Sequence, residues 1–158
     1  MSWEEELENY IDKNIVIMGI GSQLKSDDRV GLSITESLSS AGKYNVIVAG
    51  PTPEHWVGHI ANKGYEKILI VDAVTFGGIP GEIQVFDINE ISKIFGLTHA
   101  SSLHLFSDFL TKEGKLKSIK VLAIEPESLK LGTELSTAVK EAADKIIHFF
   151  KNLSSHSK

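Results

Sequence analysis

The sequence predicts an α/β fold, a three-layer sandwich in which a mostly parallel five-stranded sheet carries helices on both faces. Three observations predict it. Short apolar runs, such as residues 15–18 and 67–72, are continuous, as in strands that are buried on both faces. Between these runs lie segments whose apolar residues recur at helical spacing. Strands that alternate with helices form βαβ units, which place parallel strands side by side beneath covering helices.

Each element can be placed from its local pattern. The expected strands are residues 15–18, 45–49, 67–72, 82–86 and 120–124. The fourth alternates apolar and polar side chains and is therefore expected at a half-buried edge of the sheet. The expected helices are a leading one within residues 1–13, one from Arg29, one from Glu54 to Gly64, one over 102–112, and a closing one over 135–149.

Length and composition restrict the function. The chain has 158 residues, no cysteine and a formal charge of −5, and we expect a single domain over 1–158 that ends in a polar tail at 154–158. The absence of cysteine excludes disulfides and thiolate metal sites and suits a cytoplasmic protein. The acidic balance argues against nucleic-acid binding. No apolar run approaches the roughly 20 residues that span a bilayer, so no membrane insertion is expected.

The most informative stretch follows the first predicted strand. There a Gly19-Ile-Gly21 bend leads to Ser26-Asp27-Asp28 at the start of a helix, a layout typical of phosphate-binding turns. Two carboxylates at this position repel a phosphate and favour a cation instead. One aspartate is explained by capping of the helix, which stabilises by about 1 kcal/mol. The second predicts a functional role, since loops at strand ends often carry sites.

Two further residues are expected near Asp28. Asp72 ends the third predicted strand, where an unpaired buried charge would be costly. His99 lies in the long connection after the fourth strand. The carboxyl ends of parallel strands meet at one edge of a sheet, so the three side chains are expected to converge. Two carboxylates and an imidazole suit zinc, nickel, manganese or iron, and three ligands leave open coordination positions.

Other motifs carry less weight. His55 and His59 have the spacing of a zinc-binding helix, but Trp56 stands where a metalloprotease has its glutamate, so the pair is expected on the solvated side. Leu24 stands where a dinucleotide-binding turn has its third glycine. No Gly-x-Ser-x-Gly motif of a serine hydrolase occurs.

Residues 18–31 (MGIGSQLKSDDRVG) resemble the opening signature of the hydrogenase maturation endopeptidases. The likeness continues in order through residues 50–54 (GPTPE), 69–73 (LIVDA), 80–83 (PGEI), 98–99 (TH) and 125–126 (EP). It therefore covers nearly the whole chain. These enzymes trim the C-terminal extension of a nickel–iron hydrogenase large-subunit precursor.

The resemblance implies specific roles. The metal-contacting positions of the family match Asp28, Asp72 and His99. These residues would engage nickel carried by the precursor, for which zinc or cadmium can substitute, and Asp28 or Asp72 would act as general base. Residues beside them are expected to contact the substrate: Gly21, Ser22, Asp27, Arg29 and Thr98. Ser22 and Arg29 stand where the family often has asparagine and glycine, and Ser22 can still hydrogen-bond within the turn.

Two alternatives from other functional classes stay open on the sequence. A receiver-type signalling domain also has an acidic pair after its first strand and a phosphoacceptor aspartate after its third. The lysine that such a domain needs after its fifth strand is absent here, where Glu125 and Glu127 stand. The other alternative is a nickel-binding maturation chaperone that uses the same three residues without cleaving anything.

Overall fold

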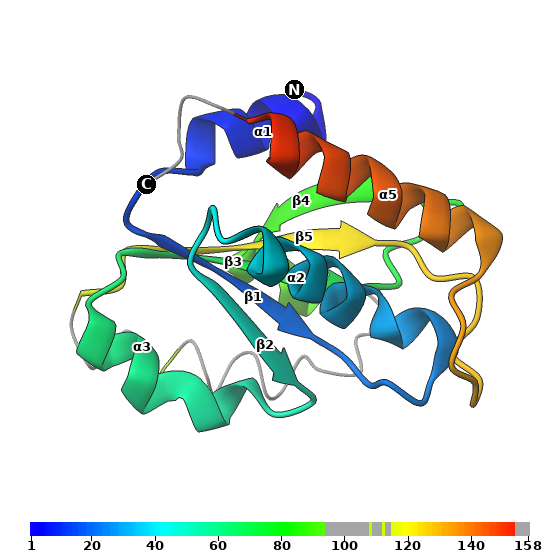
Figure 1. The fold of residues 1–158 in the computed structure, drawn as a ribbon, viewed down its shortest axis with the longest axis horizontal. Coiled ribbons are helices and arrows are strands. Elements are labelled where there is room, and N and C mark those ends of the chain that lie inside the picture. Colours follow the sequence, from blue (N-terminus) through cyan, green and yellow to red (C-terminus); the bar gives the residue numbers. More distant parts are fainter. Residues whose placement is uncertain (94–107, 109–111, 113–114, 154–158) are drawn as a thin grey trace.

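The computed structural model describes residues 1–93, 108, 112 and 115–153. It contains a five-stranded sheet in the order β2-β1-β3-β5-β4 (Figure 1). Four strands run parallel, and β4 pairs with β5 in the antiparallel direction. Their bounds are β1 (Ile15–Ile20), β2 (Val46–Gly50), β3 (Lys67–Ala73), β4 (Ile83–Asp87) and β5 (Ser118–Ile124). The five predicted strands and the edge position of the fourth are confirmed, with small shifts at their ends.

Helices cover both faces of this sheet, which confirms the predicted α/β sandwich. One face carries α1 (Trp3–Tyr10), α2 (Val30–Ala41) and α5 (Thr137–Asn152), and the other carries α3 (Val57–Lys63). Figure 1 shows α2 and α5 lying across the sheet on the same side. The helix predicted for 102–112 and the tail at 154–158 lie outside the described residues, apart from positions 108 and 112.

Alternate strand residues separate the two apolar cores. Ile17 of β1 packs with side chains of α1, α2 and α5, whereas its neighbours Val16 and Met18 pack on the other face with Ile60 of α3. All six residues of β1 are buried. This explains why the central strands are continuously apolar: each side chain enters one core or the other.

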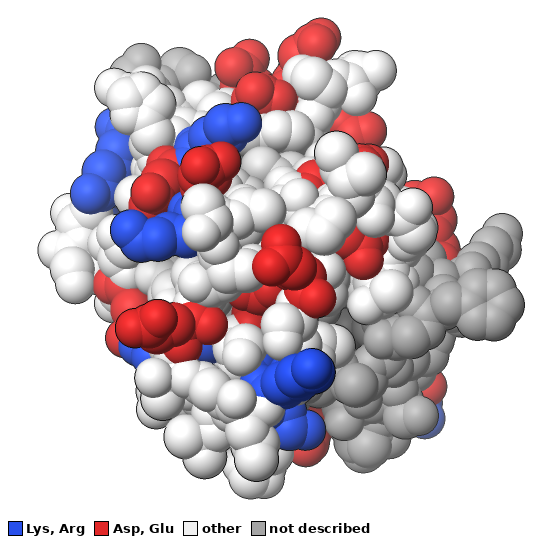
Figure 2. All heavy atoms as spheres, turned by 90° about the vertical axis from the view of Figure 1, so that its right-hand side faces the viewer, with Lys and Arg blue, Asp and Glu red and all other residues white. Residues whose placement is uncertain are grey.

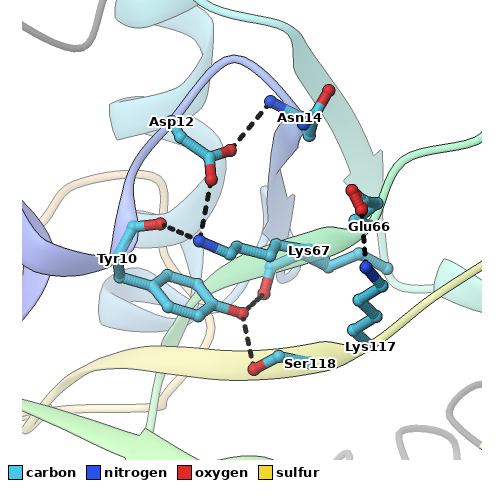
Figure 3. A network of polar contacts seen from close by, with 8 residues as sticks. Tyr10, Asp12, Asn14, Glu66, Lys67, Lys117 and Ser118 are labelled. Carbon is cyan, nitrogen blue, oxygen red and sulfur yellow. Dashed lines mark hydrogen bonds and ion pairs between the residues drawn. The ribbon is translucent and has the colours of Figure 1, made fainter.

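A polar network closes the amino-terminal edge of the sheet (Figure 3). The Tyr10 hydroxyl donates to the Ile68 carbonyl at 3.2 Å and lies 3.0 Å from the Ser118 hydroxyl. The Lys67 ammonium donates to the Tyr10 carbonyl at 3.0 Å and to the Asp12 carboxylate at 2.8 Å. Burial raises the pKa of Tyr10 to about 12. These contacts tie α1 to the first residues of β3 and β5.

The opposite edge, where the parallel strands end, is built of loops. In Figure 1 the arrowheads of β1 and β5 point toward this side, and Figure 2 views it directly. Acidic side chains outnumber basic ones on the face seen there. None of the helices that the structure describes has the length and apolar character needed to cross a bilayer.

Candidate active site at the carboxyl edge of the sheet

The order of the strands reverses between the carboxyl ends of β1 and β3, and we call this point of the sheet edge the β1/β3 crevice. From β1 the chain passes through α2 to β2 on one side, and it then returns through α3 on the opposite face to β3 on the other side. Open α/β sheets bind ligands at such a reversal of strand order, beyond the carboxyl ends of the strands. Asp28 follows β1 and Asp72 lies at the end of β3, so the two predicted carboxylates flank this crevice.

Close backbone packing holds Asp28 at this position. The 3₁₀ turn η1 (Ser26–Arg29) contains Asp28, packs against β3 and continues directly into α2. A Cβ atom on Gly31 would lie 2.2 Å from the Val71 carbonyl oxygen, and one on Gly21 would lie 2.0 Å from the Asp28 carbonyl oxygen. Only glycine permits these approaches, because such distances are far below van der Waals contact.

Both carboxylates are withdrawn from water. Asp28 is 5% exposed and Asp72 is fully buried, in register with Ala123 of β5. No described residue donates a hydrogen bond to the Asp28 carboxylate; its backbone N–H donates to the Lys25 carbonyl at 2.9 Å. Burying a carboxylate is costly, and a bound cation offsets that cost. The chemistry open to this pair is therefore metal ligation or general base catalysis.

Asp27 has a different role from its neighbour. Its carboxylate is fully buried and accepts four hydrogen bonds, from the backbone N–H groups of Glu127, Ser128 and Ser136 and from the Ser136 hydroxyl, at 2.7–3.0 Å. The N-cap residue of α2 is Arg29, and no side chain caps that helix. The expectation that one of the two aspartates caps the following helix is therefore wrong, and Asp27 instead binds the loop between β5 and α5, including Ser136, the N-cap residue of α5. Both oxygen atoms of the Asp27 carboxylate thus hold the loop between β5 and α5 in place.

Further hydrogen bonds join the same two loops. The loop between β1 and α2 and the loop between β5 and α5 exchange backbone bonds in a short parallel bridge between Lys25 and Gly132. The Ser26 hydroxyl donates to the Lys130 carbonyl at 2.8 Å, and the Arg29 guanidinium donates to the Thr133 carbonyl at 3.1 Å. Sequence reasoning missed this connection, because the partners are about a hundred residues apart and no periodic pattern reports them.

The structure describes four of the five predicted substrate-contacting residues, Asp27 among them. Gly21 is buried beneath the turn, Ser22 is half-buried and its hydroxyl accepts from the Leu24 N–H at 3.2 Å, and Arg29 is half-buried with its guanidinium on Thr133. The expected bond of Ser22 within the turn is thus confirmed. Thr98 and His99 lie outside the described residues. Within the described part of the chain, no group of three His, Asp or Glu side chains is arranged to hold a metal ion.

Glu125 organises the loop that follows Asp72. It lies just beyond β5, is 5% exposed, and one of its oxygen atoms accepts from the backbone N–H groups of Phe76 and Gly78, both at 2.9 Å. Its own N–H and carbonyl bond to Glu82 and Gly81. Glu125 therefore fixes the course of the chain from β3 to β4, a positioning role that the sequence did not indicate.

Another carboxylate lies beyond the end of β2. Glu54 belongs to the 3₁₀ turn η2 (Pro53–Trp56), and its Oε2 atom is buried without a hydrogen-bond partner among the described residues. An oxygen in this state can accept a hydrogen bond from an N–H group or bind a cation. His55 of η2 and His59 of α3 are both exposed, which confirms that this pair lies on the solvated side.

Comparisons with known proteins bear on this arrangement. The model of the hydrogenase maturation protease family matches residues 29–152, well over half of the chain. The chain belongs to the hydrogenase maturation protease family. Members are endopeptidases, so the protein is a hydrolase, and maturation proteases act in general on hydrogenase large-subunit precursors. The predicted family is thereby confirmed.

Individual relatives agree with this family assignment. The hydrogenase 3 maturation protease of Escherichia coli K12 is 28% identical over 134 residues, which cover 83% of this chain and 85% of that protein. A putative hydrogenase maturation protease of Methanocaldococcus jannaschii is 27% identical over 146 residues, covering 86% and 85%. The crystal structure of the maturation protease HycI from Thermococcus kodakarensis superposes with a TM-score of 0.80 at 27% identity, covering 95% and 96%.

Proposed function

We propose that this maturation protease removes the C-terminal extension of a nickel-loaded [NiFe] hydrogenase large-subunit precursor in the cytoplasm. In this proposal Asp28, Asp72 and His99 engage the nickel that the precursor carries, with zinc or cadmium as substitutes. The nickel is part of the substrate, so cleavage follows only after the metal has been inserted. Membership in the protease family supports the reaction class.

The two buried carboxylates at the β1/β3 crevice carry the metal part of the proposal. Asp28 lies in the turn after β1 and Asp72 near the end of β3, and both are buried from water. Two buried carboxylates supply two of the three proposed ligands for a divalent cation, and the cation offsets their mutual repulsion. His99 is the third proposed ligand on the strength of the sequence.

Peptide hydrolysis makes two demands on these residues. A water molecule must lose a proton, and the negative charge that develops on the carbonyl oxygen must be stabilised. In this proposal Asp28 or Asp72 accepts that proton, and the absence of a hydrogen bond to the Asp28 carboxylate from the described residues supports Asp28. The metal in the substrate, when bound, would stabilise that negative charge as a Lewis acid.

A processing assay tests the proposal. Purified protein is mixed with the large-subunit precursor, either nickel-loaded or nickel-free, and the released C-terminal peptide is measured by mass spectrometry. We expect release only from the nickel-loaded precursor, and a loss of at least about a hundredfold in Asp28→Asn and His99→Ala. Full activity in either variant would remove that residue from the site. Equal release without nickel would refute metal recognition.

The same assay separates the alternatives. A nickel-binding chaperone predicts metal-dependent binding of the precursor without any released peptide. A receiver-type domain predicts a phosphate adduct on Asp72 after incubation with a small phosphodonor and magnesium. The structure argues against the receiver, because Glu125 occupies the position after β5 and accepts from backbone N–H groups, where a receiver needs a lysine near the phosphate.

A further inference from the structure

Large apolar side chains are exposed mainly at the edge of the sheet that holds the candidate site. Of the six that the described surface exposes, Leu24, Ile79, Leu129 and Leu131 lie in loops at the carboxyl edge. Leu24 is 64% exposed and Leu131 is 84% exposed. Single exposed apolar side chains are ordinary on a protein surface, so the informative feature is their common location around one crevice.

Leu24 and Leu131 are held next to each other. The parallel bridge pairs Lys25 with Gly132, a register that places Leu24 opposite Leu131. The Gly132 N–H donates to the Leu24 carbonyl at 2.9 Å. The backbone segments of the two leucines are therefore adjacent, and both side chains are exposed. We call these two residues the leucine pair.

The backbone beneath the leucine pair is fixed. Asp27 binds the second loop with four hydrogen bonds, and Ser26 adds its N–H on the Gly132 carbonyl and its hydroxyl on the Lys130 carbonyl. Ser26 has a φ of 44°, a left-handed conformation that a non-glycine residue adopts at some cost. Because this backbone is already fixed, little backbone entropy is lost when a partner binds the two leucines, as in a preformed interface.

We infer that the leucine pair is a docking surface for the protein substrate, an apolar patch of the large-subunit precursor beside its cleavage segment. The inference rests on the proposed function. Asp28 and Asp72 lie buried below the loops, so a protein whose scissile bond reaches them must lie against the loop surface. Leu24 follows β1 and Leu131 follows β5, so the pair stands beside the β1/β3 crevice on the route that a folded substrate must take.

Two readouts test this docking surface with the full chain. The variants are Leu24→Ser, Leu131→Ser and the double variant, and the control is Lys117→Ser, an exposed position at the opposite edge of the sheet. Affinity for the nickel-loaded precursor is measured by biolayer interferometry, and peptide release is measured as kcat and KM. We expect the double variant to weaken binding and raise KM at least tenfold, with kcat and the melting temperature unchanged. The control should match the wild type.

Different results overturn different parts. Binding and KM within twofold of the wild type in the double variant would refute the docking surface while leaving the protease intact. A wild type that binds the precursor but releases nothing would refute the proposed cleavage, and lost binding in the double variant would then still support docking. A wild-type dimer that disappears in the double variant would assign the leucines to self-association and overturn the inference.

Discussion

Replacing Asp27 by asparagine tests whether this residue holds the two site loops together. The side chain keeps its size but loses its charge and one of its acceptor oxygens. If the amide oxygen takes the place of Oδ2, it keeps the bonds from Glu127, Ser128 and the Ser136 hydroxyl, and the amide NH₂ then faces the Ser136 N–H. One bond is lost, two donors oppose each other, and the remaining bonds lose their charge-assisted strength.

The magnitude follows from these contacts. A hydrogen bond to a charged group contributes about 1.5–3 kcal/mol, so Asp27→Asn should lower the free energy of unfolding by about 3 kcal/mol. For a domain of this size the melting temperature should fall by about 6–12 °C. The assay is urea denaturation followed by circular dichroism, with the shift read from the midpoint at constant slope.

A matched control separates the hydroxyl bond from the rest. Ser136→Ala removes only the hydroxyl donor to Asp27 and should cost about 1.5 kcal/mol, the lower end of that range. An Asp27→Asn variant within about 0.5 kcal/mol of the wild type would contradict the structural role. If that variant also lost peptide release, Asp27 would be a substrate contact, as the sequence suggested.

Three further tests are independent of this one. Gly31→Ala should destabilise the protein by about 2 kcal/mol, because overlap with the Val71 carbonyl outweighs the helix propensity gained. The control is Gly58→Ala in α3, where a Cβ meets nothing within 4 Å, and it should stabilise by up to about 1 kcal/mol in the same urea titration. Burial raises the pKa of Tyr10 to about 12, whereas an unfolded tyrosine ionises near 10, so stability should fall as the pH rises from about 10 to 12. Tyr10→Phe should be less stable at pH 8 and lose less between those pH values; a parallel loss in both proteins would contradict the assignment. Glu125→Gln should loosen the loop after β3 and speed hydrogen exchange of its amides, and unchanged protection there would argue against its positioning role.

Local sequence was sufficient for the strands and for two of the site residues. The continuous apolar runs of β1 and β3 reflect burial on both faces, a constraint that each strand meets by itself. Asp28 and Asp72 could be assigned to one edge because parallel strands end together, a rule that needs only the chain order. The half-buried edge strand β4 was visible in its alternation for the same reason.

Partners distant in the chain could not be predicted in this way. Asp27 and Asp28 are adjacent carboxylates in the same turn, and nothing in their neighbourhood shows that Asp27 binds the N-cap residue of α5 while Asp28 receives no hydrogen bond from the described residues. That difference depends on η1 packing against β3 and on a loop about a hundred residues away reaching the same place. The same long-range contact brings Leu131 opposite Leu24. The sequence determined which strands form and which edge holds the carboxylates, because periodicity and chain order are local; the tertiary structure alone decided the partner of each side chain, because a hydrogen bond between distant loops depends on packing.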